Sequence, residues 1–346
     1  MMIGRDLGRV AVLGLVICLL LIPGNVSGQA QITFKVKMPG IVSYELNLPT
    51  LVALANGYFL EQGIELTDFV IASGGTLRAA MIAKEFDFGL FAFAHIPIAR
   101  NAGSPWKAIL ATHDHEIFNL VVRTELRDKV RTVADLKGMK VGFTTPGAGA
   151  WYMGSVYLKQ SGLDPQKDVQ YLPLGGDLGV IYVALKTGRV DAFPTWEPLT
   201  TRVIEEGIAY PLTRIWEPAE HRRWLGSDRA SAMLLVTRED VIKLRPGILR
   251  RMVNAHKKGL DFIRTHSAGE IADAVMKHPK TAEFFTGLDR AVVVKIFDRI
   301  KPGFGTGCLS RSAFDVEMRL AVEYELVKQA IKFEEFADTR FAGECP

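Results

Sequence analysis

The most informative segment of the chain reads Met139-Lys140-Val141-Gly142-Phe143-Thr144-Thr145-Pro146-Gly147-Ala148-Gly149-Ala150-Trp151. Residues 139–144 are predicted to form a strand, and the glycine turn behind them leads into a helix that reaches about Gln160. A strand followed by a glycine turn and a helix is the repeating unit of α/β proteins. The segment therefore predicts an α/β fold.

The same alternation continues on both sides of this segment. Helices are expected from about Pro49, from Ser73, from Asp177 and, as the longest, over 246–264. Strands are expected at 34–38, 66–71, 88–93, 106–111, 169–174, 190–193 and 233–236. Regular alternation of this kind indicates a mostly parallel sheet.

The two halves of the chain also contain matching sequence motifs. Ala80 stands seven residues before Asp87, and Ala184 stands seven residues before Asp191. A shared order of such matches predicts two similar α/β lobes. Ligands of these sheets bind at the carboxyl ends of the strands, so two facing lobes would form one cleft.

The first thirty residues have the pattern of a signal peptide. Arg5 and Arg9 precede an apolar run over 10–22, which is shorter than the roughly 20 residues that a membrane-spanning helix needs. Small residues then allow cleavage after Gly28 or after Ala30. An uncleaved membrane anchor is the alternative. We expect a mature protein that is exported and soluble.

Composition excludes several other classes. The 42 Lys+Arg residues exceed the 38 Asp+Glu residues by four, without a basic block, so nucleic acid is not an expected partner. Cys308 and Cys345 would meet an oxidising compartment after export. They form either a disulfide, which the chain-entropy model values at about 3–4 kcal/mol, or two unpaired thiols.

Several of these motifs resemble one protein family. They are Gly74-Gly75-Thr76-Leu77-Arg78-Ala79-Ala80, the strand after Asp87, Thr144 to Gly149, and Asp191-Ala192-Phe193-Pro194-Thr195-Trp196-Glu197-Pro198. Over about 31–265 the chain resembles the periplasmic solute-binding proteins of nitrate/sulfonate/bicarbonate-type ABC importers. That family includes receptors for aliphatic sulfonates and for thiamine-pyrimidine precursors.

The resemblance implies a type II periplasmic-binding-protein fold. Two lobes would be joined by hinge crossings near 112–118 and 224–231, and the helical C-terminal third would pack on the first lobe. The expected division is 1–28 as signal peptide, 31–115 with 228–346 as lobe 1, and 116–227 as lobe 2.

The implied function is non-catalytic. The resemblance implies a periplasmic monomer, without a cofactor, that delivers a small molecule to an ABC permease with a cytoplasmic ATPase. A sensor or another transporter class is an alternative partner. A third alternative is an enzyme, because a related eukaryotic branch makes the thiamine pyrimidine. That branch carries a cysteine-rich motif, whereas this chain has no cysteine between Cys18 and Cys308.

Two glycine turns are the leading candidates for ligand contact. The helix N-terminus after Thr144 to Gly149 offers unpaired N–H groups to an anion, and glycine allows close approach. Ser73 to Thr76 would be its counterpart in lobe 1. A plain tight turn would explain either segment equally well.

Side chains at other strand ends complete the candidate site. Trp196 would form an apolar wall or pack in the core, and Glu197 would accept from an amine or bridge the lobes. The segment from His113 to Glu116 contains side chains that can bind a metal ion. No further ligands stand near it, so no metal site is predicted. The full candidate set is Tyr44, Asn47, Ser73, Gly74, Gly75, Thr76, His95, Thr144, Thr145, Gly147, Gly149, Trp151, Trp196 and Glu197.

The ligand class stays open between two chemistries. Glycine turns favour sulfonate, taurine-like or nitrate oxygens, whereas Trp196 and Tyr44 suit a flat pyrimidine precursor. No arginine lies within the predicted binding loops, which disfavours a highly charged anion.

Overall fold

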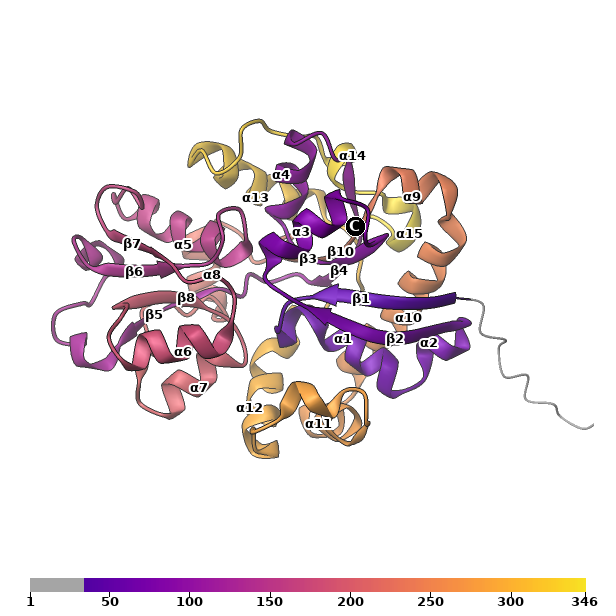
Figure 1. Ribbon diagram of the computed structural model, residues 1–346, viewed down its shortest axis with the longest axis horizontal. Coiled ribbons are helices and arrows are strands. Elements are labelled where there is room, and N and C mark those ends of the chain that lie inside the picture. The colour runs from indigo at the N-terminus through magenta and orange to yellow at the C-terminus, as the bar shows by residue number, and fades with distance from the viewer. Residues whose placement is uncertain (1–33) are drawn as a thin grey trace, which may run out of the picture.

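The computed structural model describes residues 34–346, which form two α/β lobes side by side (Figure 1). The predicted signal peptide and its cleavage sites lie outside these residues. No helix within 34–346 combines the length and the apolar character needed to cross a membrane.

Lobe 1 contains two small sheets. Its elements are β1 (Phe34–Gly40), α1 (Tyr44–Ala55), α2 (Tyr58–Glu61), β2 (Ile64–Ile71), α3 (Gly74–Ile82), β3 (Phe88–Ala92), α4 (His95–Asn101), β4 (Trp106–His113) and β10 (Met233–Arg238). β1 and β2 pair in parallel. β10 lies between β3 and β4 and is antiparallel to both, so β3 and β4 run in the same direction.

Lobe 2 is built around one five-stranded sheet. Its elements are β5 (Asn119–Arg123), η1 (Thr124–Leu126), η2 (Val133–Leu136), β6 (Lys140–Phe143), α5 (Gly149–Gln160), β7 (Gln170–Pro173), α6 (Leu178–Lys186), β8 (Ala192–Thr195), α7 (Leu199–Glu205), β9 (Ala209–Pro211) and α8 (Pro218–Leu225). The strand order is β7-β6-β8-β5-β9. Only β5 runs against the other four strands. In lobe 2 four of the five strands thus run in the same direction, as predicted, whereas in the three-stranded sheet of lobe 1 β10 is antiparallel to both neighbours. The reversed strands β5 and β10 are those that follow a crossing between lobes.

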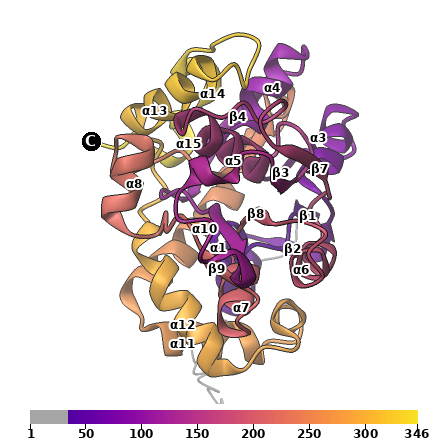
Figure 2. The same cartoon turned by 90° about the vertical axis from the view of Figure 1, so that its left-hand side faces the viewer.

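The C-terminal third is helical and contacts both lobes. Its elements are α9 (Glu239–Leu244), α10 (Pro246–Thr265), α11 (Ala268–Lys277), η3 (Ala282–Phe285), α12 (Arg290–Ile300), η4 (Lys301–Gly303), α13 (Arg311–Glu323), α14 (Phe333–Phe336) and α15 (Thr339–Ala342). α10 packs on α1, as expected for lobe 1. However, the Tyr152 hydroxyl of α5 donates to the Glu317 carbonyl of α13, and Lys295 of α12 pairs with Glu205 of α7. Figure 2 shows α13 and α12 at opposite ends of this arrangement.

The C-terminal segment is linked covalently to the preceding part of the chain. Cys308 and Cys345 form a disulfide across a sequence separation of 37. Beside it, the Cys345 amide donates to the Leu309 carbonyl at 3.0 Å.

The first helix begins earlier than its sequence pattern predicts. Pro49 suggested a first-turn proline, but α1 begins at Tyr44 and Pro49 lies inside it. The reason is Ser43, whose Oγ accepts from the Leu46 amide at 3.2 Å and caps the helix. As a consequence, Tyr44 and Asn47 belong to a buried helix and not to a loop after β1.

Candidate functional site

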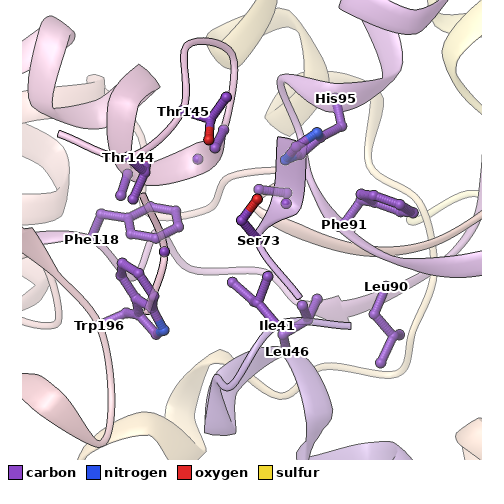
Figure 3. A pocket seen from close by; sticks show the side chains of 16 residues that line it. Ile41, Leu46, Ser73, Leu90, Phe91, His95, Phe118, Thr144, Thr145 and Trp196 are labelled. Atoms are coloured by element: carbon purple, nitrogen blue, oxygen red, sulfur yellow. The ribbon is translucent and has the colours of Figure 1, made fainter. Parts of the chain in front are cut away.

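A pocket lies between the lobes, where their strand ends and helix starts face each other (Figure 3). The space between its walls is about 450 Å³, part of it open to solvent. Lobe 1 contributes Ile41, Leu46, Ser73, Gly74, Leu90, Phe91, Ala92 and His95; the hinge contributes Phe118; lobe 2 contributes Thr144, Thr145, Ala148, Gly149, Ala150, Gly176 and Trp196. We call this space the cleft pocket.

The polar part of the lobe 1 wall is the start of α3. Ser73 caps this helix, because its Oγ accepts from the Thr76 amide at 3.2 Å. The first-turn N–H groups of Gly74 and Gly75 are left without partners inside the helix. A Cβ on Gly74 would lie 2.9 Å from the His95 Nε2 atom. Glycine is therefore what lets the helix start approach the imidazole.

The facing wall is the turn between β6 and α5. Thr144 Oγ1 accepts from the Trp151 amide at 3.1 Å, which caps α5 from the end of the strand. Gly147 has a φ of +79°, a left-handed conformation that glycine adopts without strain. A Cβ on Gly149 would collide with the Phe118 ring and lie 2.8 Å from the Ala92 Cβ. The backbone of this turn is thus packed directly against the pocket floor.

Aromatic and aliphatic side chains form the rest of the cleft pocket. Trp196 is 2% exposed and meets Phe118 edge-on, with ring centroids 5.7 Å apart. Its Nε1 donates to the Val42 carbonyl of lobe 1 at 2.6 Å. Trp196 therefore combines the two roles that were alternatives in the sequence, because it lines the pocket and is also packed and bonded between the lobes.

His95 is the one titratable side chain that lines the cleft pocket. It is 3% exposed, and burial, assisted by the positive charge of Arg78, holds its pKa well below the ordinary value. Arg78 Nη1 lies 3.2 Å from the His95 Nδ1 atom. The same guanidinium donates across the cleft to the carbonyls of Gly147 at 3.0 Å and Pro146 at 3.2 Å.

Arg78 is a residue that sequence reasoning missed. The sequence contained a signal for it, since Arg78 follows Gly74 by four residues and so lies on the same face of α3. The apolar lining residues offered no comparable signal, because Ile41, Leu90 and Phe118 look like ordinary core residues.

The structure brings together half of the predicted set. Seven predicted residues line the cleft pocket: Ser73, Gly74, His95, Thr144, Thr145, Gly149 and Trp196. The other seven do not line it: Tyr44, Asn47, Gly75, Thr76, Gly147, Trp151 and Glu197. The Tyr44 hydroxyl donates to the Phe284 carbonyl at 2.8 Å, and Asn47 Nδ2 donates to the Ile41 carbonyl at 2.6 Å. These two donors are therefore occupied within lobe 1.

Glu197 lines a second space, which we call the hinge cavity. Its walls are Glu45, His113, His115, Glu116, Ile117, Asn119, Glu197, Ile215, Trp216, Arg299 and Ile300. Glu197 is 2% exposed and forms an ion pair with Arg299 at 2.9 Å. The Glu197 amide donates to Glu45 Oε1 at 3.1 Å. Burial, together with the charge of Glu197, raises the pKa of Glu45 to about 8.

The His113 to Glu116 segment forms part of this hinge cavity. Both ring nitrogens of His113 lie 2.9 Å from backbone carbonyls, those of His115 and Ile300. Within residues 34–346, no three His, Cys, Asp or Glu side chains are grouped as a metal ion would require.

Two α/β lobes, two crossings and a pocket between strand ends define the class: this is a type II periplasmic-binding-protein fold. The NMT1/THI5-like family model matches residues 47–269, which is more than half of the chain. The chain belongs to the NMT1/THI5-like family.

Solved structures share this fold, and a synthase is related to the chain in sequence. The alkanesulfonate-binding protein SsuA from Xanthomonas axonopodis pv. citri, bound to MOPS, is 16% identical with a TM-score of 0.69, over 87% of this chain and 97% of that one. A C27S mutant of DszB in complex with biphenyl-2-sulfinic acid is 14% identical with a TM-score of 0.61, over 89% and 97%. The 4-amino-5-hydroxymethyl-2-methylpyrimidine phosphate synthase THI12 of Saccharomyces cerevisiae is 22% identical over 73% of this chain and 72% of its own length.

Proposed function

We propose that the protein is the exported solute-binding subunit of an ABC importer and that its ligand occupies the cleft pocket. The observation that carries this proposal is the chemistry of the lining. Among the described residues, 34–346, the lining side chains are apolar, hydroxyl or imidazole, without a carboxylate, lysine or cysteine. Such a surface is suited to holding a small molecule and releasing it unchanged to a permease.

The same lining favours one kind of ligand. Trp196, Phe118 and Phe91 offer area to a flat or apolar body, while the helix starts at Gly74 and Gly149 offer N–H donors. We therefore favour a ligand with an apolar or heteroaromatic body and an acceptor end, such as an organic sulfonate or a pyrimidine precursor. Nitrate has no apolar body, and the ammonium group of taurine would find no carboxylate among the lining residues.

An enzyme is the second candidate, because THI12 is a synthase by name and DszB is described as a desulfurization enzyme. Catalysis in the cleft pocket would have to use His95 or the hydroxyls of Ser73, Thr144 and Thr145. Ser73 is committed to the α3 cap through Thr76, with the two hydroxyl oxygens 2.8 Å apart. This geometry supports binding over covalent chemistry.

A thermal-shift screen tests the proposal directly. The panel contains alkyl and aryl sulfonates, taurine, nitrate, bicarbonate, carboxylates and pyrimidines. A ligand present at 100 times its dissociation constant stabilises the native state by about 2.7 kcal/mol, which gives a clear shift. Binding without turnover of an aryl sulfonate or pyrimidine is the expected result. Conversion of a screened compound to product would instead favour the enzyme.

Export and the division into lobes also belong to this proposal. Intact-mass analysis of periplasmic material should find a chain that starts at Gln29 or Gln31, and retention of Met1 in the membrane fraction would contradict export. Lobe 1 (31–115 with 228–346) and lobe 2 (116–227) should close toward each other when the ligand binds. A smaller radius of gyration in small-angle scattering measures that closure.

A further inference from the structure

Arg78 makes no ion pair in the described structure, although its guanidinium is half-buried between the lobes. Its hydrogen-bond partners are neutral: the imidazole of His95 and the carbonyls of Pro146 and Gly147. Three such contacts from two lobes hold the guanidinium in one orientation. One of these contacts is with His95, which lines the cleft pocket.

The contact decides which nitrogen of His95 carries the proton. A guanidinium can only donate hydrogen bonds, so His95 Nδ1 must accept with a lone pair. The ring is neutral, because burial and the Arg78 charge both lower its pKa. A neutral imidazole with an unprotonated Nδ1 carries its proton on Nε2. Among the described groups, Arg78 is the charged one that acts on this pKa.

The Nε2–H group then faces the polar end of the cleft pocket. The Nε2 edge lies against the start of α3, since a Cβ on Gly74 would meet it at 2.9 Å. No side chain or backbone acceptor within 34–346 is hydrogen-bonded to Nε2. Figure 3 shows the His95 ring on the same side as Ser73. The imidazole donor therefore lies beside the N–H group of Gly74 at one end of the pocket.

We propose that Arg78 is a positioning residue that holds His95 as the Nε2–H tautomer, so that the cleft pocket selects ligands with a hydrogen-bond acceptor at this end. This inference rests on the proposed binding function. Arg78 itself does not line the pocket and acts through His95. A ligand that presents an ammonium group or another donor here would face the Nε2–H of His95 and the N–H of Gly74, which cannot accept, and this leaves buried donors unpaired.

Nitrogen-15 NMR of the histidine side chains in the ligand-free protein tests the tautomer. His95 is assigned by the loss of its signals in His95→Asn. We expect a pyridine-like Nδ1 and a pyrrole-like Nε2 in the wild type, without titration over the pH range in which the protein stays folded. In Arg78→Met both tautomers should be populated, and the imidazole should titrate at a higher pH. Arg78→Lys should restore the wild-type pattern, because an ammonium also can only donate.

The matched control is Arg251→Met. Arg251 also donates from Nη1 to a backbone carbonyl, that of Gln62 at 2.7 Å, but on the outside of lobe 1. This variant should leave the His95 signals unchanged. A pyrrole-like Nδ1 in the wild type, or identical spectra for wild type and Arg78→Met, would overturn the role of Arg78.

A pair of probes with the same ring tests the selectivity. Benzenesulfonate carries acceptors, and benzylamine carries donors at the corresponding place. We expect only benzenesulfonate to shift the His95 Nε2 signal, and we expect a smaller shift in Arg78→Met. Equal shifts with both probes, or none with either, would overturn the selectivity. A failed ligand screen would count against the proposed function and would leave the tautomer measurement standing.

Discussion

Trp196 and Glu197 are neighbours in the chain, each 2% exposed, yet they line two different spaces. Trp196 faces the cleft pocket, whose lining holds no charged carboxylate or amine. Glu197 faces the hinge cavity, where it pairs with Arg299. Trp196 directly follows β8 and Glu197 lies in the turn behind it, so one step along the chain changes the environment from apolar to ionic.

The hinge cavity and the cleft pocket differ in how their charged and polar groups are bonded. In the hinge cavity the charged groups are bonded to one another, for example Glu197 to Arg299 and to the Thr201 amide and hydroxyl. In the cleft pocket the first N–H groups of α3 and α5, those of Gly74 and Gly149, have no hydrogen-bond partner among residues 34–346. We therefore expect changes in the hinge cavity to alter folding stability and changes in the cleft pocket to alter ligand affinity.

The largest expected effect is on the hinge side. Arg299→Met removes the counter-charge of a buried carboxylate and should lower the free energy of unfolding by about 3–5 kcal/mol. Lys295→Met is the matched control on the same helix, because its pair with Glu205 is about half-exposed and should contribute little to stability. Urea denaturation measures both. Equal effects would show that burial does not distinguish the two ion pairs.

On the cleft side, Trp196→Ala should weaken ligand affinity. Loss of ring contact should reduce affinity by about 1–3 kcal/mol, or roughly 5- to 150-fold. Isothermal titration with a ligand from the screen measures this. Trp216→Ala is the matched control, because Trp216 lines the hinge cavity under Arg299, with the guanidinium carbon 4.5 Å from the ring centroid. Unchanged affinity in Trp196→Ala, or an equal loss in Trp216→Ala, would contradict the assignment of the pocket.

Gly149→Ala should have an effect of similar size that acts on stability as well as on affinity. Its Cβ has no room beside Phe118 and Ala92, so the α5 start must shift and stability should fall by about 1–3 kcal/mol. Ligand affinity should fall as well, because the shifted N–H groups belong to the pocket. Gly247→Ala places the same methyl in the first turn of α10, where nothing lies within 4 Å. Denaturation and titration of the two variants should therefore differ in sign or size, and similar behaviour would argue against a close approach at Gly149.

The subtlest expected effect is the pH dependence from Glu45. Its pKa of about 8 in the folded protein exceeds its ordinary value of 4.5, so between these values the native state retains a proton that the unfolded state releases. Stability from this group is therefore present below about pH 4.5 and declines as pH rises through 8. Glu45→Gln should flatten that decline in denaturation curves collected across the window. A parallel profile for the variant would mean that Glu45 ionises normally.

The sequence match between Asp87 and Asp191 can be compared with the positions of these two residues in the lobes. Asp87 precedes β3 and pairs with Arg238, the last residue of β10, at 3.2 Å. Asp191 precedes β8 and lies 3.4 Å from Arg123, the last residue of β5. The matched aspartates thus occupy equivalent places in two related sheets. Their arginine partners come from strands that arrive after a crossing, which no local pattern predicts.

Some features of the fold depend only on residues that are near neighbours in the chain, and these could be predicted from the sequence. Strand periodicity, the glycine turns after β2 and β6, and the matched Asp87 and Asp191 predict two α/β lobes with polar helix starts at their strand ends. These features depend on neighbours within a few residues, such as a glycine that must adopt a positive φ or a helix start that lacks partners for its N–H groups.

Only the tertiary structure decided which of these groups meet. Arg78 reaches His95 because α3 and α4 pack side by side within lobe 1. It reaches the carbonyl of Gly147, 69 residues away in the chain, because the two lobes pack against each other. The turn from Trp196 to Glu197 divides two cavities because helix α12 brings Arg299 to one side of it. Long-range packing sets the direction of a buried side chain, and the residue type alone leaves that direction open.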